Sequence, residues 1–91
     1  MPVKVRVPPS LRHVTDPSTL EVDVKNLGEC IDQLEKAIPG IKTRLCNTQG
    51  QVLSGFDFYI NGISAYPASL TMALNDGDEI NIIPIEVDTG G

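Results

Sequence analysis

The segment from Asn26 to Ile38 constrains the fold most, because its apolar residues recur at helical spacing while the segments around it alternate. One face of the segment collects Leu27, Cys30, Ile31, Leu34 and Ile38. Asn26 is a good N-cap, Glu29 follows three residues later as in a capping box, and Pro39-Gly40 ends the helix. A helix with one apolar face buries that face against another layer, which here has to be a sheet.

Period-two alternation of apolar and polar residues indicates strands on both sides of this helix. The expected strands span residues 3–7, 20–24, 56–60, 63–65 and 79–85. Asn61-Gly62 is a strong hairpin signal, residues 41–45 are expected to add a short helical turn, and 47–55 and 67–74 read as connections. The order predicts an α+β roll: a mixed sheet of four to five strands, one main helix on one face, and first and last strands parallel in the middle.

Size and charge exclude several classes of protein. The 91 residues suit one domain, expected over 1–85, with 86–91 as a flexible C-terminal tail. A net charge of −5 without a basic stripe argues against nucleic-acid binding, and no apolar run approaches membrane length. Cys30 and Cys46 form no CxxC pair, and with one histidine they are too few for zinc, so no metal site is expected and the expected location is the cytoplasm.

The chain ends in Gly90-Gly91, and this end is the strongest candidate for chemistry. A terminal carboxylate has a pKa of about 3.5, so it is ionised at neutral pH and reacts with a nucleophile only after activation, for example as an adenylate. Two residues without Cβ atoms let the backbone enter a narrow channel. No phosphate-binding loop and no nucleophile–base pair accompany the glycines, which indicates a carrier rather than an enzyme. The competing interpretation is an ordinary frayed terminus.

The sequence from Leu74 to Ile80 (LNDGDEI), then Ile83-Pro84, then the terminal Gly-Gly resembles the MoaD/ThiS-like, ubiquitin-related sulfur-carrier family. The resemblance extends over the whole chain, and residues 9–15 and the loop at 47–55 look most like the CysO type. It implies a β-grasp (ubiquitin-like) fold. The tail segment Glu86 to Thr89 is more acidic than this family leads one to expect.

The resemblance also implies a function. An E1-like enzyme, using ATP that the carrier itself does not bind, would adenylate Gly91, and a sulfur donor would convert it to a thiocarboxylate. A sulfur-accepting synthase of a cysteine, molybdopterin or thiamine-type pathway would then take the sulfur. Gly90, with Thr89 and Asp88, would be recognised as the tail. Two alternatives stay open: a ubiquitin-like modifier joined to lysines through Gly91, and a β-grasp interaction subunit whose Gly-Gly is incidental.

The last strand suggests where a partner docks. If Ile80 and Ile82 face the helix, Ile83 and Ile85 face the other side of the sheet, and apolar residues on an open sheet face indicate a docking patch. Tyr59 is expected to join them. The alternative is that Val52 and Leu53 of the loop cover the patch.

The remaining polar and thiol side chains read as structural. Cys30 is expected to be an inert core thiol, whereas Cys46 is expected to be half exposed. Asp76 and Asp78 are interpreted as turn residues around Gly77 rather than as paired catalytic carboxylates.

Overall fold

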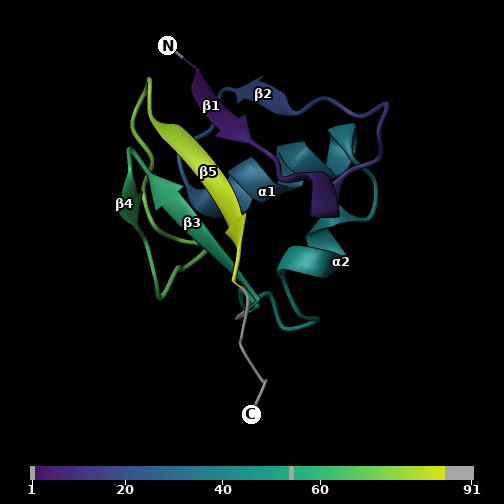
Figure 1. Cartoon of the computed structure of the whole chain (residues 1–91). Coiled ribbons are helices and arrows are strands. Elements are labelled where there is room, and N and C mark those ends of the chain that lie inside the picture. Colours follow the sequence, from purple (N-terminus) through teal and green to yellow (C-terminus); the bar gives the residue numbers. More distant parts are fainter. Residues whose placement is uncertain (1, 54, 86–91) are drawn as a thin grey trace.

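The computed structural model describes residues 2–53 and 55–85. In chain order its elements are β1 (Val3–Arg6), the 3-10 turn η1 (Pro9–Leu11), β2 (Thr19–Val22), α1 (Leu27–Ala37), α2 (Ile41–Leu45), β3 (Phe56–Ile60), β4 (Ile63–Ser64) and β5 (Glu79–Pro84). The strands form one five-stranded sheet in the order β2-β1-β5-β3-β4. In Figure 1, α1 lies behind this sheet and β5 crosses its middle. The predicted α+β roll with one main helix is confirmed.

The pairing of the first and last strands is also as predicted. β1 runs parallel to β5 with Val5 opposite Ile80, while β1–β2, β3–β5 and β3–β4 are antiparallel. Asn61 and Gly62 turn the β3–β4 hairpin with φ of 52° and 83°, the left-handed conformation that this turn requires.

The core lies between α1 and the inner face of the sheet. Its fully buried members include Val5, Leu27, Leu34, Phe58 and Ile80, each at most 1% exposed. The alternating valines of β1 and the apolar face of α1 are therefore buried, as their spacing predicts. Burial of these side chains is the main stabilising contribution, at about 25 cal/mol for each Å² of apolar surface removed from water.

The first turn of α1 is closed by the protein's own polar groups. The Asn26 side chain accepts from the Glu29 N–H at 2.8 Å, as the predicted N-cap. The Leu27 and Gly28 N–H groups donate to the carbonyls of Met72 and Leu70 at 3.1 and 2.8 Å. A Cβ at Gly28 would lie 3.1 Å from the Leu70 oxygen, so glycine permits this close crossing. With these donors satisfied, the helix start offers no site for an anion.

Several strand boundaries differ from the sequence prediction: β1 ends at Arg6 rather than at residue 7, and β2 begins at Thr19 rather than at residue 20. β2 ends at Val22, although Val24 is buried, because the chain there leaves the sheet and the Lys25 carbonyl accepts from the Leu74 N–H at 2.8 Å. β4 is shorter than predicted and ends at Ser64. β5 ends at Pro84, which has no N–H to donate.

Candidate partner-docking face

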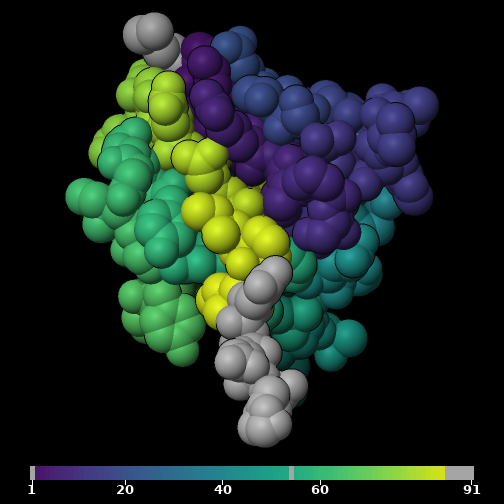
Figure 2. Space-filling model, in the orientation of Figure 1, coloured from purple at the N-terminus to yellow at the C-terminus, as the bar shows by residue number. Residues whose placement is uncertain are grey.

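The face of the sheet opposite α1 is the open face, and it carries the side chains predicted to dock a partner. On β5, Ile80 and Ile82 are buried against the core, whereas Ile83 is 42% and Ile85 39% exposed. Figure 2 shows this face, with β5 running between β1 and β3 and no helix in front of it. The predicted division of the β5 isoleucines between the two faces is therefore what the structure has.

Cross-strand register places the neighbours of these isoleucines. Asp57 of β3 lies opposite Ile83, and Tyr59 lies opposite Asn81. Residues opposite each other in a ladder point to the same face, so Tyr59 is on the open face, as expected. Its side chain is half-buried.

The open face has a charged end and an apolar end. Near the start of β5, Lys4 of β1 lies between Glu79 and Glu21, its partners on β5 and β2. Ile83 lies near the far end of β5, and Ile85 follows one residue beyond it, where the chain leaves the sheet. An apolar surface bordered by charges is typical of a protein-docking site rather than of a small-molecule pocket.

Tyr66 is an exposed aromatic residue that the sequence analysis did not identify. It is 67% exposed and follows β4, and its N–H donates to the Ser64 hydroxyl at 3.3 Å. A tyrosine beside a proline in a connection is an ordinary turn sequence, so the pattern of residues 63–67 gives no sign of a surface aromatic group at this edge of the sheet.

The exit of the chain from the sheet is fixed. The Ile85 N–H donates to the Gly55 carbonyl at 2.9 Å, one residue beyond the end of β5. Residue 86 therefore follows a residue that is held against the start of β3. The predicted tail residues Asp88, Thr89, Gly90 and Gly91 lie outside the described residues, as does the whole predicted tail over 86–91.

The loop before β3 does not bury the apolar end of this face. Val52 packs against the core and forms a bridge with Cys46, and the Leu53 N–H donates to the Leu45 carbonyl at 2.8 Å. Both side chains are half-buried and line a hollow with Asp57 at the start of β3, while Ile83 and Ile85 keep the exposure given above.

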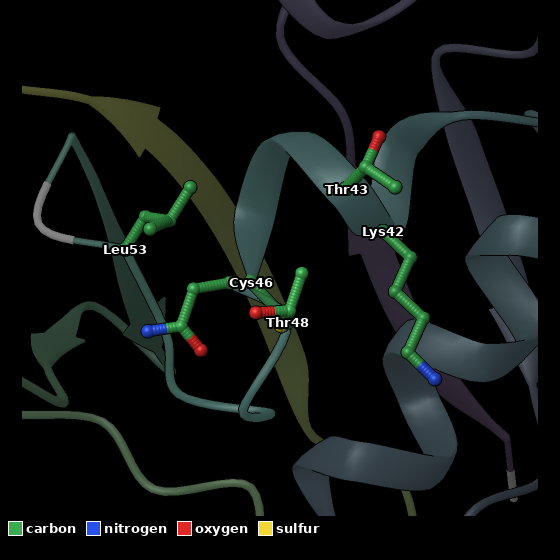
Figure 3. A pocket seen from close by; sticks show the side chains of 6 residues that line it. Lys42, Thr43, Cys46, Thr48 and Leu53 are labelled. Carbon is green, nitrogen blue, oxygen red and sulfur yellow. The ribbon is translucent and has the colours of Figure 1, made fainter.

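The second cysteine lies at a hollow of about 580 Å³ beside α2 (Figure 3), lined by Lys42, Thr43, Cys46, Asn47, Thr48 and Leu53. Cys46 is only 5% exposed, so the expectation of a half-exposed thiol was wrong; the bridge to Val52 covers it. Burial raises its pKa more than the Lys42 ammonium lowers it, and that ammonium is bonded to Asp32 at 2.7 Å. Burial likewise raises the pKa of Cys30 to about 12. Neither thiol is arranged as a nucleophile.

Asp78 of the LNDGDEI segment holds a turn together. Asp78 is 8% exposed and accepts from the Asn61 side chain at 2.9 Å and from the Asn75 N–H at 2.8 Å. Gly77 has a φ of 82° within this turn. The Asn61 side chain in turn accepts from the Glu79 N–H at 3.0 Å, so the segment links two turns at the start of β5. Its role is structural, as its interpretation as turn chemistry predicts.

Within residues 2–53 and 55–85, no group of three or more His, Cys, Asp or Glu side chains is placed to hold a metal ion. In the same part of the chain, no helix is long and apolar enough to cross a membrane.

No protein-family model and no curated protein matches the sequence significantly. Solved structures do match. A chain of the Amycolatopsis orientalis BexX/CysO complex is 28% identical with a TM-score of 0.81, covering 98% of this chain and 99% of that one. CysO of Mycobacterium tuberculosis is 29% identical with a TM-score of 0.78, covering 90% and 97%. SAMP1 of Haloferax volcanii is 26% identical with a TM-score of 0.76, covering both chains completely.

The chain has the β-grasp fold of these structures, which are MoaD/ThiS-like, ubiquitin-related proteins. The similarity to CysO supports the predicted CysO type within that family. These neighbours are ubiquitin-like sulfur carriers and modifiers, small carrier proteins rather than enzymes, and the similarity supports that class for this chain. The open face beside the exit of β5 is therefore the surface on which a function is proposed.

Proposed function

We propose that this protein carries sulfur as a thiocarboxylate at Gly91. The observation that carries the proposal is the arrangement at the end of β5: an exposed apolar face, an anchored exit at Ile85, and a sequence that continues to Gly90-Gly91. The folded body is recognised on the open face, and the last residues enter the partner's active site.

The chemistry needs two steps on the partner enzymes. An E1-like enzyme lets a Gly91 carboxylate oxygen attack the α-phosphorus of ATP, which forms the acyl-adenylate and releases pyrophosphate. A donor sulfur then attacks the Gly91 carbonyl carbon and displaces AMP. Where the donor is a persulfide, a thiol cleaves the new S–S bond and is itself oxidised, which leaves the thiocarboxylate. This chain supplies no cofactor of its own; ATP is consumed by the activating enzyme.

Tethering the sulfur to a protein turns its delivery into an oriented step of high effective concentration. The acceptor is a synthase of a cysteine, molybdopterin or thiamine-type pathway. The cytoplasm suits this sequence of steps, because ATP is available there and thiols such as Cys30 and Cys46 stay reduced. Asp88 and Thr89, with Gly90, form the segment that the activating enzyme reads.

Intact-mass measurement of the protein isolated from its own cells tests the proposal. A fraction of the molecules is expected to be heavier by the difference between one sulfur and one oxygen atom, and this fraction should disappear after alkylation and hydrolysis of the thiocarboxylate. Fragmentation should place the change on Gly91. Sulfur found on Cys30 or Cys46 instead would contradict it.

A second candidate is protein modification, favoured by the similarity to SAMP1, named a small archaeal modifier protein. The same adenylate would then be attacked by a lysine amine. Adducts of higher mass that resist thiols and carry Gly91 joined to a lysine would identify this function. The two functions share the activation step, so they are not exclusive.

The docking role of the open face gives a separate prediction. Ile83→Asp places a charge where an apolar contact is expected, and it should weaken binding to the activating enzyme by about tenfold or more. The measurement is the rate of pyrophosphate release against carrier concentration, with KM raised and the rate at saturation little changed. Val14→Asp is the matched control, because Val14 is 96% exposed on the loop before β2. Equal effects of the two variants would rule out docking through Ile83.

A further inference from the structure

A small hollow of about 150 Å³ lies at the edge of β3, on the side away from β5. Its walls come from the loop before β3, the start of β3 and the connection after β4: Val52, Leu53, Phe56, Asp57, Tyr66, Pro67 and Ala68. A water molecule takes about 30 Å³ of the liquid, so the hollow has room for a group of a few heavy atoms. Asp57 lies opposite Ile83 in the ladder, so the hollow borders the open face next to Ile83.

Asp57 is the acidic residue of this hollow, and one half of its carboxylate is unsatisfied. The side chain is only 9% exposed. Oδ2 accepts from the Ser64 hydroxyl at 2.6 Å, whereas Oδ1 is buried and has no hydrogen-bond partner in the part of the chain that the structure describes. A buried carboxylate oxygen without a donor is costly, and native proteins retain few of them.

The residues around Asp57 indicate which kind of group could donate the missing hydrogen bond to Oδ1. The lining combines the acidic group with apolar and aromatic side chains, among which Tyr66 is 67% exposed. A guanidinium group suits such a lining, because it donates in a planar fork to a carboxylate and stacks on an aromatic ring. The net charge of −5 favours a basic partner surface in the same way.

We propose that the hollow at Asp57 receives an arginine side chain of the protein that docks on the open face. The inference rests on the proposed function only in taking that protein to be the activating or the sulfur-accepting enzyme. The arginine donates to Asp57 Oδ1 and lies against Tyr66. Because Oδ1 is enclosed, entry requires a small displacement of the wall, and the exposed Tyr66 ring is the side chain freest to move. The apolar contact at Ile83 and the ion pair at Asp57 then lie side by side, close to the exit of the chain at Ile85.

The test uses the full-length protein labelled with ¹³C and ¹⁵N and the probe ethylguanidinium chloride. The expected result is a saturable shift of the Asp57 carboxyl carbon and of the Ser64 and Tyr66 amides. Tetramethylammonium chloride at equal ionic strength, a cation that cannot donate a hydrogen bond, should leave them unchanged. Asp57→Asn should weaken the response by about tenfold or more.

Ser64→Ala is the second variant, since it keeps the carboxylate and removes its internal donor at Oδ2. We expect it to bind ethylguanidinium at least as tightly as the natural protein; weaker binding would mean that Asp57 is not the acceptor, even if Asp57→Asn failed to fold. Equal shifts with both salts, or none with either, would overturn the proposal. An ordered water molecule would then be the donor to Asp57 Oδ1. The titration contains no enzyme, so its result is independent of whether Gly91 is ever activated.

Discussion

Removal of Gly91 alone should abolish activation of the protein while leaving its fold intact. The variant ending at Gly90 still has a carboxylate, but its carbon would lie one residue short of the position that the proposed activating enzyme would hold. Misplacement of a reacting atom by about 1 Å costs on the order of 100-fold in rate, and a whole residue is a larger displacement. The measurement is ATP-dependent release of pyrophosphate, together with the intact mass of the product.

The control for this truncation is Lys36→Ala, a change of an exposed side chain on α1, on the other side of the sheet from the open face. It should be activated at the natural rate, and both proteins should unfold at the same denaturant concentration. If the protein without Gly91 were still adenylated and sulfurated at the full rate, the Gly-Gly end would have no role in activation. That result would favour an interaction subunit.

Phe58→Ala should produce the largest loss of stability of any single change considered for this chain. Phe58 is 1% exposed and lies opposite Ile82 in the β3–β5 ladder, where it faces the core. Truncation of a buried phenylalanine costs about 3–5 kcal/mol, the transfer free energy of the ring plus the cavity it leaves. Single domains are stable by only about 5–15 kcal/mol, so the variant should unfold at a much lower urea concentration.

Val14→Ala serves as its counterpart. It also removes apolar atoms, but from a side chain that is 96% exposed, so the free energy of unfolding should change by no more than about 0.5 kcal/mol. If the two variants lost similar amounts of stability, the assignment of Phe58 to the core would be wrong.

Periodicity was a sufficient guide wherever one side of an element is buried. The alternation of Val3, Val5 and Val7 and the helical spacing from Leu27 to Leu34 reflect burial directly, and both elements lie where they were predicted. The Asn61-Gly62 pair identified its hairpin because its backbone conformation is closed to most residues. The same alternation along β5 predicted that Ile82 faces the core and that Ile83 faces the open side of the sheet.

Features that depend on contacts distant in sequence were not predictable in this way. Nothing local shows that Cys46 is covered by Val52, or that Val24 is buried outside a strand by the crossing segment around Leu74. Asp57 reads in the sequence as a solvent-facing residue of an alternating strand. Its burial comes from the connection after β4, whose course along β3 leaves no periodic signal.

The parallel pairing of β1 with β5 has a consequence for biosynthesis. The middle of the sheet is its last strand, so the ribosome must release residues 79–84 before β1 and β3 acquire their shared neighbour. Non-local pairing of this kind is completed late. Premature termination before residue 85 thus costs the domain its central strand, and such products are exposed to proteolysis.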